Sequence, residues 1–161
     1  GSIRVMAQKI GGSIGRDKSV DDLIALEHEL GLDRVDTLIQ FNTKISIVRD
    51  NLQKLIYSLK KEGKIIAGFG APTKATTLMA HFGLDEKVLD FIVDDNPLKQ
   101  KLFTPITHIP ILSADVLYER KPDYLLILAW NFAEPIMKMH EKYSKEIGQF
   151  ILPMPEPKVV S

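Results

Sequence analysis

The sequence predicts an α/β protein: a Rossmann-like three-layer domain with a mostly parallel sheet, plus an N-terminal helical arm. From residue 64 onward, short apolar runs alternate with helix-length segments, which is typical of parallel strands joined by helices. A glycine-rich turn separates the first apolar run from the first helical segment, and a long amphipathic segment precedes both. We expect three parts: a linker or strand that leads out of a preceding domain over 1–18, a helical arm over 19–63 and a Rossmann-like domain over 64–161.

Composition narrows the class of protein. The chain has 161 residues, 45% of them hydrophobic, which suits one domain with a core. Lys and Arg balance Asp and Glu at 21 each, so no basic excess indicates a nucleic-acid partner. No apolar run approaches the roughly 18 residues of a membrane span, no secretory signal is visible, and no cysteine is present for disulfides or thiolate metal sites. We expect a cytoplasmic protein that binds neither nucleic acid nor membrane.

The first 18 residues are expected to connect this domain to a preceding one. Residues 2–8 alternate loosely between apolar and polar side chains and are expected to form a strand. The segment Gly11-Gly12-Ser13-Ile14-Gly15 contains the G-x-S-x-G pattern of a nucleophile elbow. That elbow requires a strand directly before the serine and a helix directly after it, and neither is expected here. We therefore interpret this segment as a flexible loop.

Two helices are expected before residue 63. Ser19 and Asp22 have the spacing of a capping box and predict a helix over 20–30. A longer helix follows, to about residue 62, with an apolar seam of about three heptads. Such a seam fits either a coiled coil that forms a homodimer or a helix packed across a sheet, which we favour. The seam residues are Leu38, Phe41, Ile45, Val48, Leu52, Leu55 and Leu59.

The remaining chain alternates between strands and helices. The expected strands are 65–69, 88–93, 124–130 and 149–152. The expected helices are 72–82, a short one over 113–118 and one over 131–145 that Asn131 caps. Three prolines after residue 152 predict an irregular tail.

The turn after the first strand is the leading candidate for a ligand site. Gly68 and Gly70 would let the backbone approach a ligand closely, and Pro72 suits the first turn of a helix. Unpaired N–H groups and the helix dipole at such a junction favour a phosphate, and Lys74 would add a positive charge. The third glycine of G-x-G-x-x-G is replaced by Thr73, and the motif lacks the ending of a Walker A loop. Ligand binding and a turn that binds nothing are both compatible with this motif.

Polar side chains follow two other strands at the same expected edge of the sheet. Asp94, Asp95 and Asn96 follow the second strand, and Trp130 and Asn131 follow the run 124–130. An aspartate there commonly accepts hydrogen bonds from a ribose, but Asp-Asp-Asn-Pro is equally typical of a turn. Trp130 can stack on a base or a sugar, although a core or interface position is more common. The four histidines lack metal-binding spacing, so we expect no metal site.

Four ordered blocks of the sequence together resemble the C-terminal domain of the sugar C-methyltransferase family. The blocks are residues 68–77 (GFGAPTKATT), 93–100 (VDDNPLKQ), 104–111 (TPITHIPI) and 127–132 (ILAWNF). Members of that family act on nucleotide-linked deoxysugars. They contain an N-terminal zinc-binding segment, a central domain that binds S-adenosylmethionine (SAM) and holds the catalytic base, and a C-terminal Rossmann-like domain. This sequence is similar to the last part only.

The resemblance implies that the chain closes over a nucleotide-linked deoxysugar and helps to position it against the methyl donor. Its partners would be that nucleotide-linked sugar and the preceding SAM-binding domain, with SAM and zinc held outside this chain and no methyl transfer by this chain alone. Ile106 stands where the family often has glycine, and Met6 where it often has an aromatic residue. The residues implied to bind the nucleotide-sugar are Gly68, Gly70, Ala71, Pro72, Lys74, Thr76, Asp95, Asn96, Trp130 and Asn131.

Two functions of other classes are also compatible with the sequence. The first is a non-catalytic association module that dimerises through the long helix. The second is a dinucleotide-dependent oxidoreductase, which the missing third glycine and the absence of a second, substrate-binding domain disfavour.

Overall fold

The computed structural model describes residues 3–161, in which the chain divides into two compact units, Gly1–Thr43 and Lys44–Ser161. The first unit contains helix α1 (Lys18–Glu29) and the beginning of helix α2 (Val35–Lys61). The strand expected over 2–8 is wrong for residues 3–8, which form neither strand nor helix, while Ser2 lies outside the described residues. All described strands lie between residues 66 and 160, so residues 3–8 have no strand to pair with in their own unit.

The capping box expected at the start of α1 is also wrong. The N-cap is Asp17, whose Oδ1 accepts a hydrogen bond from the backbone N–H of Ser19 at 2.9 Å. Aspartate is as good an N-cap as serine, and it comes first in the chain, so the helix begins two residues earlier than the box predicts. The loop around Ser13 has neither a strand before it nor a helix directly after it, as expected.

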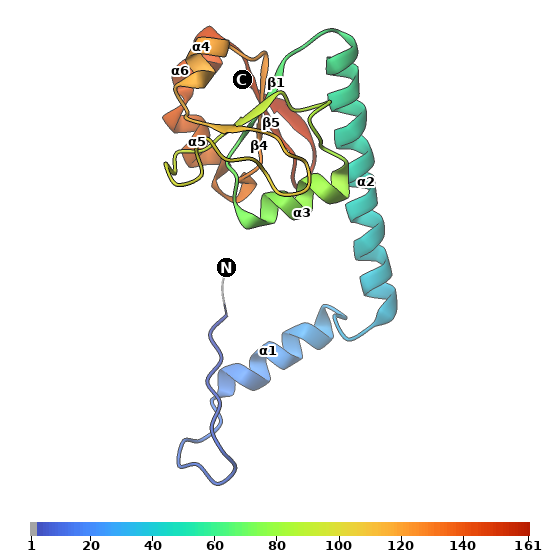
Figure 1. Cartoon of the computed structure of the whole chain (residues 1–161). Coiled ribbons are helices and arrows are strands. Elements are labelled where there is room, and N and C mark those ends of the chain that lie inside the picture. Colours follow the sequence, from blue (N-terminus) through green and yellow to red (C-terminus); the bar gives the residue numbers. More distant parts are fainter. Residues whose placement is uncertain (1–2) are drawn as a thin grey trace. The chain divides into compact units, whose positions relative to one another are not determined.

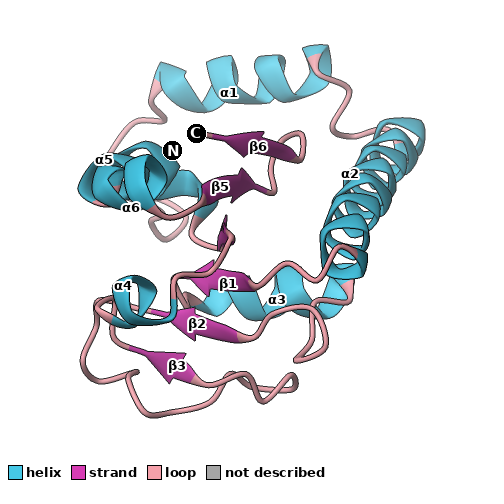
Figure 2. Ribbon diagram, turned by 90° about the horizontal axis from the view of Figure 1, so that it is seen from above, coloured by secondary structure: helices cyan, strands magenta, loops and turns pink. Residues whose placement is uncertain are grey.

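The second unit is built on a six-stranded, mostly parallel sheet in the order β3-β2-β1-β4-β5-β6 (Figure 2). Its strands are β1 (Ile66–Phe69), β2 (Phe91–Val93), β3 (Ile111–Leu112), β4 (Tyr124–Ile127), β5 (Gln149–Leu152) and β6 (Lys158–Val160). Strands β1 to β5 are parallel and β6 runs antiparallel to β5. This order is that of a Rossmann-like fold, so the predicted fold class is confirmed.

Strands β2 and β4 are clearly shorter than expected, and two strands, β3 and β6, were missed. Strand β2 begins only at Phe91, because Val88 and Leu89 form a turn with Asp85 and are buried without joining the sheet. Strand β4 ends at Ile127. The three prolines after residue 152 predicted an irregular tail, but this tail contains strand β6. The strand begins at Lys158, directly after Pro157.

Helices cover both faces of this sheet, which makes three layers (Figures 1 and 2). One face carries α3 (Thr73–Phe82) and residues 44–61 of α2, and the other carries α4 (Val116–Arg120), α5 (Ala133–Met139) and α6 (Glu141–Glu146). The prediction of a single helix over 131–145 is wrong, because this segment forms a 3-10 turn (Trp130–Phe132) followed by the two separate helices α5 and α6. Asn131 lies inside the 3-10 turn and caps no helix. The break falls at His140, where the backbone leaves helical geometry.

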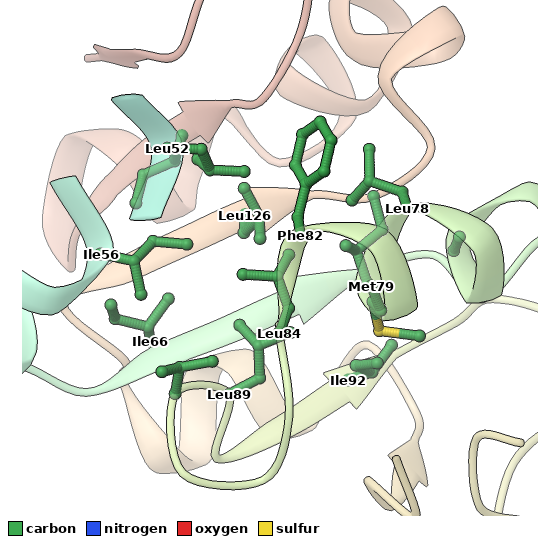
Figure 3. Packing of buried hydrophobic residues seen from close by; sticks show 14 of the residues in the cluster. Leu52, Ile56, Ile66, Leu78, Met79, Phe82, Leu84, Leu89, Ile92 and Leu126 are labelled. Atoms are coloured by element: carbon green, nitrogen blue, oxygen red, sulfur yellow. The ribbon is translucent and has the colours of Figure 1, made fainter. Parts of the chain in front are cut away.

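The packing of α2 shows, for part of the helix, whether its apolar seam packs on the sheet or is free to form a coiled coil. Leu52 and Ile56 are buried in one cluster with side chains of α3 and of strands β1, β2 and β4 (Figure 3). Leu59 belongs to the same cluster. The sheet-packing interpretation is therefore right for the C-terminal half of the helix. Leu38 and Phe41, from the same seam, remain exposed.

Candidate functional site

The candidate site lies at the carboxyl edge of the sheet, where the strand order changes direction. Strand β1 has β2 on one side and β4 on the other, so the loops that follow these three strands start next to one another. Gly70 N–H donates to the carbonyl of Val93 at 2.7 Å, and Leu128 N–H donates to that of Phe69 at 2.9 Å. Ligands of open α/β sheets bind at such a switch point.

Two glycines shape this edge for different reasons. Gly70 has a left-handed backbone (φ 87°), and a Cβ there would lie 2.9 Å from the Cβ of Ala129. Gly68 lies within β1, where a Cβ would come within 2.8 Å of Leu128 Cδ1 and 2.9 Å of Ile92 Cγ1. Gly70 thus lets the first and third loops approach each other, whereas Gly68 is required by packing inside the core.

Asp94 is the most heavily bonded side chain of the site. Its carboxylate accepts hydrogen bonds from Ala71 N–H at 2.7 Å, Asn96 N–H at 2.9 Å and the Lys99 ammonium at 3.0 Å. Burial raises the pKa of Asp94, but these three hydrogen bonds and the charge of Lys99 outweigh it and hold the pKa below its ordinary value. Asp94 therefore ties the turn after β1 to the loop after β2 as a carboxylate.

The neighbouring polar residues are arranged as a turn. Asn96 Oδ1 accepts a hydrogen bond from Leu98 N–H at 3.0 Å, and Asp95 and Asn96 are both exposed. The sequence was compatible with a ribose contact or a turn at this segment, and the hydrogen bonds of Asp94 and Asn96 are those of a turn. Asp95 is the aspartate whose carboxylate is left on the surface.

Lys74 and Trp130 bring the first and last sequence blocks together. The ammonium of Lys74, in the first turn of α3, lies 4.7 Å from the centre of the Trp130 ring and 5.7 Å from that of Phe132. These are cation–π distances. Trp130 also packs against the core cluster, as its core interpretation expects, while Asn131 and Phe132 are exposed. Stacking of a ligand on Trp130 stays a prediction.

A groove of about 320 Å³ opens beside the first turns of α3. One wall is formed by α3 and the turn before it, including Ala71, Pro72 and Thr76. The other is formed by the loop after β2. The lining residues are Ala71, Pro72, Thr73, Ala75, Thr76, Met79, Lys99, Leu102, Phe103, Thr104, Pro105 and Ile111. A larger hollow, of about 480 Å³, is lined by residues of α2 alone and by none that follows a strand.

The loop that forms the outer wall of the groove has an unusual backbone. Lys101 (φ 68°), Ile106 (φ 69°) and His108 (φ 50°) all adopt left-handed conformations without being glycine. Buried Thr104 holds the loop in shape, because its hydroxyl bonds Thr107 Oγ1 at 2.7 Å and Ile109 N–H at 2.9 Å. The sequence singled out residues 104–111 as one of four blocks, but it did not predict their left-handed backbone or their place in the groove wall.

His140 is a buried polar residue on the other face of the sheet that sequence reasoning also missed. Its ring is 5% exposed, lies 4.9 Å from that of Phe69, and places Nδ1 3.2 Å from the hydroxyl of Tyr118. Within residues 3–161, its Nε2 has no hydrogen-bond partner. Burial lowers the pKa of His140, and the charge of Asp95 opposes this only in part. Its spacing from Ile136 and Tyr143, four and three residues, was the available signal of an inward-facing position.

The described residues show two further absences. Within residues 3–161, no three His, Asp or Glu side chains gather in a way that could hold a metal ion. No helix of that part is both long and apolar enough to cross a membrane.

Comparison with known proteins decides the family. The family described as the C-methyltransferase C-terminal domain matches residues 1–155. The chain belongs to this C-methyltransferase C-terminal domain family. It is also 35% identical over 161 residues to a protein named C-methyltransferase NovU, from Streptomyces niveus. That match covers 100% of this chain and 38% of the relative, so the chain spans well under half of the relative's length.

Membership of the C-methyltransferase C-terminal domain family covers the whole candidate site. The matched stretch contains the glycine turn, Asp94, the strained loop and Trp130. Of the predicted binding residues, the structure brings Ala71, Pro72 and Thr76 together along the groove. Lys74 and Trp130 contact each other but are not among the residues that line it. Gly68 is enclosed in the core, and Asp95, Asn96 and Asn131 lie on the surface.

Proposed function

We propose that this C-methyltransferase C-terminal domain helps to bind a nucleotide-linked deoxysugar and to position it for SAM-dependent methyl transfer. The methyl donor, the zinc and the catalytic base would belong to a preceding domain of the parent protein. Positioning of a reactant can supply a large part of a rate enhancement without any reacting group. We accordingly expect no methyl transfer by this chain alone.

The observation that supports this proposal most is the meeting of Lys74 and Trp130 at the first turn of α3. A cation and an aromatic ring together suit a ligand with a negative charge and a flat or apolar ring, as a sugar nucleotide has. Both residues stand at the carboxyl edge of the sheet, where α/β domains bind ligands. The family supplies the reaction class, because the matched proteins are C-methyltransferases by description.

The test is a titration of the ¹⁵N-labelled chain with thymidine diphosphate, NAD and SAM, each alone. We expect saturable amide shifts at Lys74, Thr76 and Asn131 with thymidine diphosphate, and none with SAM. Lys74→Gln should weaken binding about tenfold, because a charge-assisted hydrogen bond is lost. Lys138→Gln, which removes an exposed lysine from α5, is the matched control. Saturable shifts with NAD instead would favour an oxidoreductase, and an unmoved site with all three ligands would contradict the proposal.

A second candidate, the association module, has one observation in its favour. Leu38 and Phe41 of α2 and several apolar side chains of α1 are exposed, including Leu26. Exposed apolar stripes of this kind often mark contacts between proteins. Light scattering of the purified chain would reveal a dimer, and a dimer that Leu38→Lys dissociates would support this function in addition to the first.

A further inference from the structure

We propose that Asp94 is an internal anion that fills the phosphate position of the glycine turn. A ligand phosphate is thereby excluded from the N–H groups of Ala71 and Asn96, and a sugar nucleotide meets the groove with an uncharged part. The second statement rests on the proposed function, whereas the first concerns only this chain and can be tested without a sugar nucleotide.

The first step is to account for the backbone donors of the turn. In Rossmann-like domains a phosphate is bound by the N–H groups between the first strand and the following helix. Here Gly70 N–H donates to the carbonyl of Val93, and Ala71 N–H donates to Asp94 Oδ2 at 2.7 Å. Pro72 has no N–H. The N–H groups of Gly70 and Ala71 are therefore satisfied within the chain, which leaves a phosphate those of Thr73 and Lys74 in the first turn of α3.

The second step is the charge at this point. The Asp94 side chain is 10% exposed and pairs with the Lys99 ammonium at 3.0 Å, while its other oxygen accepts from Asn96 N–H. A carboxylate with two N–H donors and a cation has the environment that these domains usually give to a phosphate. A ligand phosphate at Ala71 would have to displace this carboxylate or lie against it, and like charges at such a distance repel.

The third step is the character of the neighbouring groove. Among the described residues that line it, Lys99 is the one with a charged side chain, and that charge is paired with Asp94. The other lining groups are apolar side chains and threonine hydroxyls, such as those of Thr73 and Thr76. A neutral, partly apolar wall with hydroxyl groups suits an uncharged ring that carries hydroxyl or carbonyl groups. Lys74 is not among the lining residues, and its ammonium remains available to a phosphate outside the groove.

Inorganic pyrophosphate is the probe, and three proteins are compared: the unmodified chain, Asp94→Ala and Asp95→Ala. Asp94→Ala frees the N–H groups of Ala71 and Asn96 and the Lys99 ammonium, so it should create an anion site. Asp95→Ala removes the same charge from the adjacent, exposed position without freeing these donors. Binding is followed through the amide signals of Ala71 and Asn96, and through the urea midpoint of unfolding at rising pyrophosphate concentration.

We expect Asp94→Ala to bind pyrophosphate at least about tenfold more tightly than the unmodified chain and Asp95→Ala, with saturable shifts at Ala71 and Asn96. Its unfolding midpoint should rise with pyrophosphate, and those of the other two proteins should change much less. Saturable shifts of Ala71 and Asn96 in the unmodified chain would overturn the proposal, and so would an Asp94→Ala protein that gains no affinity. If Asp94→Ala is too unstable, Asp94→Asn replaces it, and the titration of the unmodified chain still decides.

The statement that a sugar nucleotide meets the groove with an uncharged part is tested by a separate titration. Thymidine diphosphate added to the unmodified chain should shift the amides of Thr76 and Thr104 more than that of Ala71. Larger shifts at Ala71 and Asn96 would overturn this statement. If thymidine diphosphate shifts no signal, the proposed function fails, while the pyrophosphate comparison still decides whether Asp94 is an internal anion.

Discussion

Ile106 combines a β-branched side chain with a left-handed backbone (φ 69°), and its side chain is 74% exposed. Such a conformation costs on the order of 1–3 kcal/mol in a residue other than glycine. We predict that Ile106→Gly raises the free energy of unfolding by about 1 kcal/mol, after the larger entropy of glycine in the unfolded chain is subtracted. Urea unfolding measures it. Ile106→Ala keeps the Cβ, so an equal gain there would contradict strain as the cause.

His140 predicts a dependence of stability on pH. Because burial lowers the pKa of His140 in the folded chain, the unfolded chain binds the proton more readily. Stability is therefore complete above the ordinary histidine pKa of about 6.5 and falls as the pH drops below it. Urea unfolding at pH 7.5 and 5.5 should show this loss, and His140→Gln should reduce it. His81→Gln, at an exposed position of α3, should leave the loss unchanged; an equal loss in all three proteins would exclude His140 as its source.

At the scale of residues, the sequence indicated segments that meet at one edge of the sheet, but not what the individual residues of each segment do. Asp94 and Asp95 have the same side chain and adjacent positions, and only the path of the backbone turns one toward Ala71 and leaves the other exposed. The sequence assigned Gly68 to a ligand-binding turn, but in the structure its missing Cβ makes room for the side chains of Leu128 and Ile92. Both distinctions depend on residues distant in the sequence, which local patterns do not encode.

The two halves of α2 predict opposite responses to the same substitution. Leu52 is fully buried and Leu38 is 56% exposed, although both belong to one apolar seam. Leu52→Ala should lower the free energy of unfolding by about 2–5 kcal/mol, because it removes buried methyl groups and leaves a cavity. Leu38→Ala should change it by less than about 0.5 kcal/mol in the monomer. A large, concentration-dependent effect of Leu38→Ala would instead indicate that this half of the helix is covered by a second copy.

At the scale of elements, the sequence predicted the long, periodic segments well and the short, non-local ones poorly. Helix α3 ends at Gly83, whose left-handed backbone was foreseeable from its residue type. The break between α5 and α6 was not, because a helical pattern continues through His140, and burial of Tyr143 with its hydroxyl on the Pro122 carbonyl fixes α6 separately. Strand β6 was missed because it depends on β5 for pairing, and three prolines concealed it.

At the scale of the molecule, both core clusters lie within residues 44–161. Among the described residues of the first unit, Gly31 is the one that is buried. We predict that the chain lacking residues 1–43 still folds, with a free energy of unfolding within about 1 kcal/mol of that of the whole chain. Urea unfolding of both proteins, followed by circular dichroism, measures it. A truncated protein without a cooperative transition would show that residues 3–43 contribute to the core.

The fold as a whole was predictable because alternating strands and helices admit few arrangements. The candidate site was predictable only as an edge: three loops follow parallel strands and therefore start on the same side. The outer wall of the groove was not, because the loop from Lys101 to His108 reaches α3 through a backbone conformation that its residue types disfavour.

The contact between Lys74 and Trp130 has a practical consequence. Trp130 is the single tryptophan of the chain, so all of its indole fluorescence arises 4.7 Å from that ammonium. A ligand that draws Lys74 away from the ring, or covers the ring itself, changes the emission of the whole protein at once. The molecule therefore carries its own optical reporter at the candidate site, and ligands can be screened by intrinsic emission without any label.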